Sequence, residues 1–501
     1  MKHPHLFWIL IDSARNYQTD EDDRGLPQSV VDFAQESHFF KNVITSAPST
    51  VQSISSMMTS SPSYLLARSY NNFRGQLSCF DYFPNMLKKE GYDVFGAIYF
   101  KHGREVMSNM FGMINKSYYP NNLSHRKEVW ENRDVYNLFT NILDKHHWKN
   151  PTMCYLHFNV RVDVNISEVV QDTLDRIREK GLMDDSVVVI NSDHGYPSAD
   201  KNYNFEEGLK QGWGHDKYLT NDNILTPLVL HYPGVKPAVV EEYVATIDIV
   251  PTLCELMNIT PSTKFRGGNI LQPAEHLAKR LHRTDNRYIG QLPSFTSYIL
   301  DQLKCIIEKD KNNYETYSFT SLLDDPKEQA YRSFSEEFGL FRQAILSDVQ
   351  KLNNFHRDFL KECWGKSDKM PHANSLKTAC IIMSSTPDFE RITREALQII
   401  YPEVTFNFTR DASSEEFDFA FAILESEVPW HFTTLKKLVA GVKSRKTLYL
   451  DNNGKVYSGF VGLKLYLEFF RKRIALVKHD KLFLLELIKR MFKKKLLNPI
   501  R

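Results

Sequence analysis

One apolar run, residues 187–190, ends at an acid and an imidazole, because the segment reads VVVINSDHG and places Asp193 and His194 just beyond it. The run has no alternation of polar and apolar residues, so it predicts a strand covered on both faces, as in a parallel sheet. Ligands gather at the carboxyl ends of such strands. Asp193 and His194, followed by a flexible Gly195, therefore suit a metal site at a strand tip. Ser-Asp-His-Gly is also ordinary turn material, and this stretch alone leaves both interpretations open.

The composition limits the class of protein. A chain of 501 residues exceeds one ordinary hydrophobic core, so two or more domains are expected. A hydrophobic content of 42% and a charged content of 25% are typical of a soluble globular protein, and a net charge of +2 gives no reason to expect a nucleic-acid partner. The six scattered cysteines form no CxxC pair, which favours a reducing compartment and argues against a cysteine-based zinc site.

The first apolar stretch, residues 6–11, is followed by Asp12 and Arg15. It is too short for a signal sequence or a membrane span, so it predicts the first buried strand of a cytoplasmic protein. Strand-like and helix-like segments then alternate over roughly the first 260 residues. This alternation predicts an α/β fold with a mostly parallel sheet and helices on both faces. We expect a first domain at 1–363, with a small antiparallel addition at about 285–325.

The remainder of the chain predicts three further parts. The polar segment WGKSDKMPHANS, residues 364–375, suits a linker. Residues 376–455 resume the α/β rhythm and predict a smaller Rossmann-like unit, to which we assign no nucleotide because it lacks GxGxxG. Residues 456–501 predict a basic amphipathic helical tail, in which 471–501 hold eleven Lys and Arg against Asp480 and Glu486. Such a helix can bind the anionic inner face of a membrane, or it can pack on its own domain with a solvated basic face.

Two further segments carry candidate site residues. Asp12 ends the strand-like FWILID, and the hydroxyl-rich SAPSTVQSISSMMTSSP, residues 46–62, enters a predicted helix. Ser and Thr at a helix start commonly act as caps. A helix amino terminus also binds anions and favours an alkoxide over an alcohol. A hydroxyl there, beside a divalent cation held by Asp12, Asp193 and His194, would be an activated nucleophile.

Seven segments occur in the order and approximate spacing of the alkaline phosphatase/sulfatase superfamily: ILIDSAR, TVQSISSMMTSSP, KKEGYDVFGA, VVVINSDHG, GWGHDKYLTNDNILTPLVLHYPG, TIDIVPTLCELMNI and LLDDPKEQ. Each segment alone is a weak signal, whereas the ordered set is specific. The chain most resembles the sulfatase-like branch, which includes phosphodiesterases, phosphonate hydrolases and phospho-group transferases. The resemblance covers residues 5–330 and implies an alkaline-phosphatase-like fold.

The resemblance also implies roles for individual residues. Asp12 matches the first metal carboxylate of the family, and Asp193 and His194 match the later metal pair. His215, in GWGHDK, matches a histidine that contacts the transferring group of the substrate or, in two-metal members, a second ion. Lys217 is expected to help neutralise that group.

Two residues extend the predicted anion site. Lys101 and His102 lie near the place where sulfatases have a Lys and a His for the anion, although the offset differs from the family pattern. We expect both side chains at the substrate.

Two alignments of the nucleophile segment compete. Counting back about nine residues from Met58-Thr59 places the nucleophile at Thr50 and the following substrate-site serine at Ser53. The other alignment lays SAPST on the sulfatase signature and selects Ser46, but it puts Thr50 where the signature has an arginine. The first alignment is favoured. Thr50 cannot yield the formylglycine of classical sulfatases, so the resemblance implies phosphorus chemistry.

The expected function is that of a metal-dependent hydrolase or transferase of phosphate esters, acting through a covalent phospho-Thr50 intermediate on glycan or lipid-linked substrates. Ser13 stands where sulfatases carry a second acid, and Val162 stands where many members have a histidine. We therefore expect one divalent cation, Mn, Mg, Ca or Zn, held by Asp12, Thr50, Asp193 and His194. The alternatives are a sulfatase and a catalytically inactive scaffold that binds a glycan.

Overall fold

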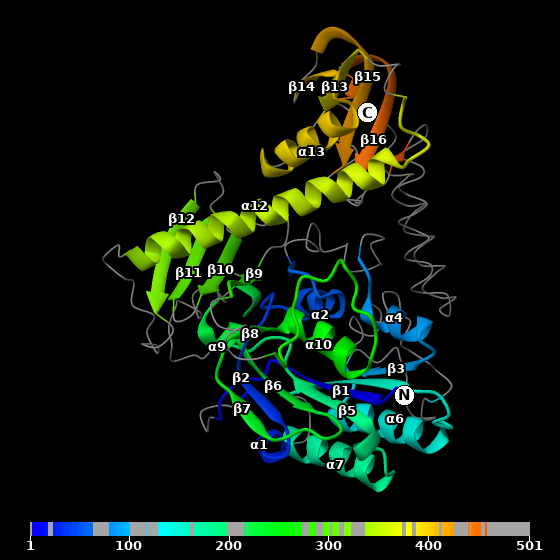
Figure 1. Ribbon diagram of the computed structural model, residues 1–501, viewed down its shortest axis with the longest axis vertical. Helices are drawn as coiled ribbons and strands as arrows, with labels where there is room; N and C mark the ends of the chain where they lie inside the picture. Colours follow the sequence, from blue (N-terminus) through cyan, green and yellow to red (C-terminus); the bar gives the residue numbers. More distant parts are fainter. Residues whose placement is uncertain are drawn as a thin grey trace, which may run out of the picture. The chain divides into compact units, whose positions relative to one another are not determined.

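The structure is a computed structural model. It describes residues 3–18, 24–63, 80–100, 118, 129–160, 165–197, 215–217, 219–272, 280–286, 294–300, 303–309, 315–321, 336–372, 377–382, 387–409, 413–424, 439–440, 442–451 and 456–457. The described chain divides into two compact units, residues 1–348 and 349–501 (Figure 1).

The first unit is built on an eight-stranded sheet with the order β3-β4-β1-β5-β6-β2-β7, in which β8 also pairs with β2. All pairings among β3, β4, β1 and β5 are parallel, whereas β6 runs antiparallel to both β5 and β2. The strands are β1 His5–Asp12, β2 His38–Ile44, β3 Asp93–Ile98, β4 Thr152–Asn159, β5 Ser186–Asn191, β6 Leu225–His231, β7 Ala238–Val240 and β8 Val244–Ala245.

Helices cover both faces of this sheet (Figure 1). On one face lie α1 Gln28–Ala34, α6 Asn132–Lys145 and α7 Ile166–Glu179; on the other lie α2 Thr50–Thr59, α4 Phe83–Lys89 and α10 Ile249–Leu256. Every residue of β1 and β5 is buried, as the unbroken apolar runs predict. Phe7, Ile9 and Ile11 pack into the core beneath α1, α6 and α7, while Trp8 on the opposite face meets Phe83 of α4.

Short helical segments and a second sheet complete this unit. The short segments are η3 Met183–Asp185, η4 His215–Lys217, α9 Asn221–Ile224 and η5 Thr246–Asp248. The second sheet is antiparallel, with the order β12-β11-β10-β9, and occupies residues 282–321. Its strands are β9 His282–Asp285, β10 Ser294–Leu300, β11 Leu303–Lys309 and β12 Glu315–Ser321.

The long helix α12, Glu336–Gly365, contains the division between the units. Near its start, Phe341 and Ile345 pack against Tyr298 and Cys305 of the antiparallel sheet. Near its end, Leu360 and Trp364 belong to the core of the second unit. That unit has a five-stranded sheet with the order β14-β13-β15-β16-β17, parallel except for β17. Its elements are β13 Thr378–Ile382, α13 Pro387–Ile400, β14 Thr405–Thr409, β15 Ser413–Leu424, β16 Val442–Asp451 and β17 Val456–Tyr457.

The expected fold class is confirmed: a mostly parallel sheet with helices on both faces, together with a smaller α/β unit. The domain limits remain expectations, and the tail residues 458–501 lie outside the described residues. Among the helices that are described, none is both long enough and apolar enough to span a membrane.

Candidate active site

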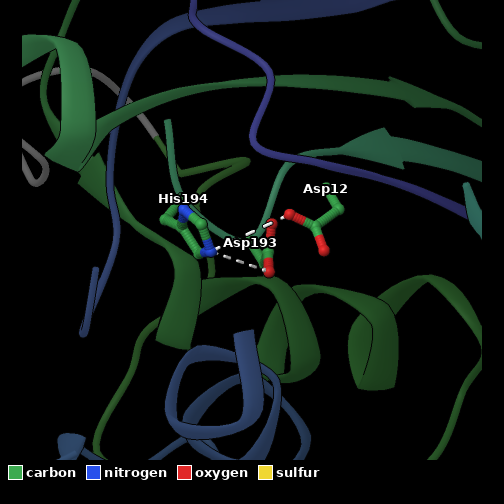
Figure 2. A group of neighbouring side chains, drawn as sticks. All are labelled: Asp12, Asp193 and His194. Carbon is green, nitrogen blue, oxygen red and sulfur yellow. Dashed lines mark ion pairs between the residues drawn. The ribbon is translucent and has the colours of Figure 1, made fainter. Parts of the chain in front are cut away.

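Three candidate residues meet at the carboxyl ends of two neighbouring strands, because β1 pairs directly with β5. Asp12 ends β1, and Asp193 and His194 follow β5 (Figure 2). Each offers one ligand atom, and these three atoms all lie within 4.8 Å of one another. His194 Nε2 is 3.4 Å from Asp193 Oδ2 and 3.9 Å from Asp12 Oδ1. All three side chains are buried.

The imidazole of His194 is oriented by its own backbone neighbour. His194 Nδ1 lies 2.7 Å from the main-chain oxygen of Gly195, which can only accept, so Nδ1 carries the proton. The lone pair of Nε2 then faces the two carboxylates, which is the usual arrangement of a metal-binding histidine. Gly195 is required by close packing, since a Cβ atom there would lie 1.9 Å from the main-chain oxygen of Asp222.

The two carboxylates have opposite pKa shifts. Burial opposes the charged form of Asp12, but the adjacent imidazoles of His157 and His194 and the Ser13 hydroxyl favour it, so the pKa of Asp12 lies below its ordinary value. Burial, reinforced by the negative charge of Asp12, raises the pKa of Asp193. A divalent cation would relieve this like-charge repulsion.

Thr50 brings a hydroxyl to the same place. It is the first residue of α2, and its Oγ1 lies 3.4 Å from Asp12 Oδ2 and 3.2 Å from His194 Nε2. Its neighbour Ser49 forms the N-cap but makes no side-chain capping bond. The hydroxyl therefore stands at a helix amino terminus, where the helix dipole favours negative charge.

The two serines of this segment have different surroundings. Ser53 is fully buried, and its Oγ donates to the main-chain oxygen of Asp193 at 2.6 Å and lies 2.9 Å from Thr45 Oγ1, so it braces the strand end that carries His194. Ser46 is also buried, and its main-chain oxygen accepts from the Ser63 hydroxyl at 2.9 Å. No described contact joins Ser46 to Asp12, Asp193 or His194, the three residues that could hold a metal ion.

His215 stacks on His194, with ring centroids 4.8 Å apart and an interplanar angle of 25°. Burial and the nearby His194 lower the pKa of His215 to about 3, so its ring is neutral at neutral pH. Its Nε2 is buried without a hydrogen-bond partner in the described structure. The backbone of Lys217 lies in the same short helix, whereas its side chain, like Lys101 and His102, lies outside the described residues.

The sequence reasoning missed three side chains that contact Asp12. Tyr99 donates from its hydroxyl to Asp12 Oδ2 at 2.8 Å, and Ser13 donates to Oδ1 at 2.7 Å. His157, fully buried on β4, places Nε2 3.6 Å from Oδ2. Burial, followed by the charge of Asp12, raises the pKa of Tyr99, so the phenol keeps its proton and acts as a donor. Tyr99 directly follows β3, and that position at a strand end was the available signal.

These residues fit a divalent cation. The group offers two carboxylates, a hydroxyl and an oriented imidazole, a mainly oxygen donor set that suits Mn, Mg, Ca or Zn. Asp193 Oδ2 is buried and has no hydrogen-bond partner among the described groups, as expected for an oxygen placed to bind an ion.

Comparison with known proteins agrees with this fold. The family model described as Sulfatase matches residues 4–160 and 164–259, just over half of the chain. Lipoteichoic acid synthase 1 of Bacillus subtilis is 31% identical over 111 residues, which are 22% of this chain and 17% of that protein. The corresponding synthase of Staphylococcus saprophyticus is 30% identical over the same shares of both chains. The chain thus matches about a sixth of the length of these relatives.

Solved structures show the same fold at low sequence identity. An alkaline phosphatase superfamily protein from Vibrio parahaemolyticus has a TM-score of 0.52 at 15% identity. The match covers 71% of this chain and 88% of that protein's chain. A lipoteichoic acid synthase from Listeria monocytogenes has a TM-score of 0.51 at 16% identity, covering 70% and 93%. The phosphonate monoester hydrolase of Agrobacterium radiobacter has a TM-score of 0.52 at 13% identity, covering 70% and 96%.

Proposed function

The chain belongs to the sulfatase family, and within that family we propose that it is a metal-dependent hydrolase or transferase of phosphate esters with Thr50 as its nucleophile. The observation that carries this proposal is the position of Thr50 Oγ1, 3.4 Å from Asp12 Oδ2 and 3.2 Å from His194 Nε2. A hydroxyl between a buried carboxylate and an imidazole lone pair, at the start of a helix, has the surroundings of an activated nucleophile.

The proposed reaction has two steps, in which Thr50 and Asp12 have separate roles. The Thr50 oxygen attacks phosphorus as its hydroxyl loses a proton, a Thr50–O–P bond forms, and the ester P–O bond breaks, with the leaving alcohol gaining one proton in exchange for the one that Thr50 gives up. Water or an acceptor hydroxyl then cleaves the phospho-threonine and restores Thr50. Asp12 is ionised because its pKa lies below the ordinary value, and it accepts the hydrogen bond of the Thr50 hydroxyl. A cation held by Asp12, Asp193, His194 and Thr50 would favour the alkoxide and polarise a phosphoryl oxygen.

We assign His215, which stacks on His194, a contact with the transferring group. Its low pKa keeps the ring neutral, and a neutral imidazole still offers one N–H to a phosphoryl oxygen. This supports stabilisation of negative charge by His215 over donation of a proton to the leaving group. Lys217, Lys101 and His102 remain proposed anion contacts on the basis of the family resemblance alone.

The substrate class rests on two observations. Threonine cannot be oxidised to the aldehyde that sulfatases use, so Thr50 favours phosphate over sulfate esters. The curated relatives named lipoteichoic acid synthases support a glycan or lipid-linked substrate, although their match covers only 111 residues.

The test is a panel of p-nitrophenyl phosphate, bis-p-nitrophenyl phosphate and p-nitrophenyl sulfate, assayed with bound metal. The full-length chain is compared with Thr50→Ala, and Ser46→Ala is the matched hydroxyl control. We expect hydrolysis of a phosphate ester that falls by at least about a thousand-fold in Thr50→Ala and stays near wild type in Ser46→Ala. Of these two hydroxyls, Thr50 contacts Asp12 and His194, whereas no described contact joins Ser46 to them.

The other outcomes identify the competing functions. Turnover of the sulfate ester alone, or loss of activity in Ser46→Ala and not in Thr50→Ala, would replace the proposal with a sulfatase. A purified chain that binds no stoichiometric divalent metal and turns over none of the esters would be the inactive scaffold.

A further inference from the structure

A second layer of side chains surrounds the Asp12 carboxylate. The Tyr99 hydroxyl donates to Asp12 Oδ2 at 2.8 Å, and it is itself oriented by Asn159, whose Nδ2 donates to the Tyr99 oxygen at 2.9 Å. Asn159 is held in turn by Asn132 at the start of α6: its main-chain N–H donates to Asn132 Oδ1 at 2.9 Å, and Asn132 Nδ2 donates to its main-chain oxygen at 2.8 Å. Groups from the residue after β3, from the end of β4 and from the start of α6 thus form a chain of hydrogen bonds that ends on Asp12.

The other Asp12 oxygen has its own donor. Ser13 Oγ donates to Oδ1 at 2.7 Å, so each carboxylate oxygen accepts one strong hydrogen bond from a buried or half-buried hydroxyl. A carboxylate oxygen can accept two bonds, so Oδ1 retains capacity for one more, whereas the second position at Oδ2 faces the Thr50 hydroxyl at 3.4 Å. Two fixed donors hold the plane of the carboxylate, since rotation about the Cβ–Cγ bond would break both hydrogen bonds.

We propose that Tyr99 is a positioning residue that fixes the Asp12 carboxylate for a divalent cation and thereby sets the affinity of the site for that cation. This inference rests on the proposed function, because it takes Asp12 as a metal ligand. Groups that orient metal ligands typically change metal affinity by 10–100-fold when they are removed. Tyr99→Phe removes only the hydroxyl, and the affinity for Mn²⁺ should fall within that range.

The chain offers a matched control at the other end of β3. Tyr92 directly precedes this strand as Tyr99 directly follows it, and its hydroxyl donates to the main-chain oxygen of Pro4 at 3.0 Å. Tyr92→Phe therefore also deletes a tyrosine hydroxyl that donates a hydrogen bond, but at the edge of the sheet away from Asp12. Asn159→Ala is the second variant, because it leaves the Tyr99 hydroxyl in place and removes the amide that orients it.

The experiment titrates Mn²⁺ into the chelator-treated full-length chain by isothermal titration calorimetry, with the melting temperature of the metal-free protein measured in parallel. We expect the dissociation constant for Mn²⁺ to be about 10–100-fold larger in Tyr99→Phe than in wild type. It should rise by a smaller factor in Asn159→Ala and stay unchanged in Tyr92→Phe. A merely structural role would lower the melting temperature of the metal-free protein and leave the affinity of the folded fraction unchanged.

Two results overturn the inference: equal Mn²⁺ affinity in wild type, Tyr99→Phe and Asn159→Ala, or an equal loss in Tyr92→Phe. If Tyr99→Phe does not fold, the affinity of Asn159→Ala decides alone. An Asp12→Asn chain separates this inference from the proposed function. If wild type and Asp12→Asn bind Mn²⁺ alike, the metal site itself is wrong, whereas loss in Asp12→Asn with no effect of Tyr99 and Asn159 refutes only the positioning role.

Discussion

A buried histidine in the antiparallel sheet makes the stability of the fold sensitive to acid. His282 on β9 is buried, its Nε2 has no hydrogen-bond partner within the described residues, and burial lowers its pKa to about 4 from the ordinary 6.5. Below pH 6.5 the unfolded chain binds a proton at this residue that the folded chain binds only near pH 4. The stabilising contribution is therefore complete above pH 6.5 and is lost as the pH falls towards 4.

We expect wild type to lose about 3 kcal/mol more than His282→Leu between pH 7 and pH 4, since each unit of pKa difference is worth about 1.4 kcal/mol. Urea denaturation at a series of pH values, followed by tryptophan fluorescence, measures this difference. Parallel pH profiles of the two proteins would show that His282 does not titrate in this range.

Individual residues also show which parts of the site were accessible to sequence reasoning. Asp193 and His194 were accessible because they are adjacent and directly follow an apolar run. Tyr99 offered only its position at a strand end, and His157 offered no signal, since a histidine in a strand pattern is ordinary. Their contact with Asp12 depends on the order β3-β4-β1 in the sheet, which the sequence pattern does not specify.

Among the elements, β9 of the antiparallel sheet secures the segment that enters α2. The Thr284 hydroxyl donates to the main-chain oxygen of Thr45 at 2.5 Å, and the Asp285 N–H donates to that of Ser46 at 3.0 Å. The Thr45 hydroxyl in turn donates to the main-chain oxygen of Asp193 at 2.5 Å. A small sheet remote in sequence thus holds the approach to Thr50.

Thr284→Val should therefore lower kcat roughly 10-fold with little change in KM, because a small displacement of Thr50 weakens the transition state more than substrate binding. Thr284→Ser should restore the wild-type rate. The matched control is Thr296→Val. The hydroxyl that it removes donates to the Asp285 carboxylate inside the same sheet at 2.8 Å. The measurement is steady-state kinetics on the ester of the panel that wild type hydrolyses fastest. An unchanged kcat in Thr284→Val would show that β9 does not position Thr50 for catalysis.

Over the whole molecule, the rhythm of strands and helices predicted the α/β class and the smaller second unit, because apolar periodicity reports burial directly. It could not predict that β6 runs antiparallel between β5 and β2, since a buried strand reads alike in either direction. The charged pattern over residues 329–363 also predicts a helix, and the structure has α12 at Glu336–Gly365.

The basic tail carries a proposal at the same scale. We propose that residues 471–501, with eleven Lys and Arg against two acidic residues, bind an anionic membrane surface on the cytoplasmic side. The full-length chain should sediment with phosphatidylserine vesicles in low salt, and binding should weaken at high salt because the attraction is electrostatic. Equal sedimentation with phosphatidylcholine vesicles, or none with either lipid, would instead indicate a tail that packs on its own domain.

The central claim is that Asp12, Thr50, Asp193 and His194 share one divalent cation. A crystal of the full-length chain soaked in Mn²⁺ and measured at the manganese absorption edge tests it most directly. The account predicts one anomalous peak within about 2.0–2.4 Å of an oxygen or nitrogen atom from each of the four residues. A peak that excludes Thr50, or no peak between the ends of β1 and β5, would contradict it.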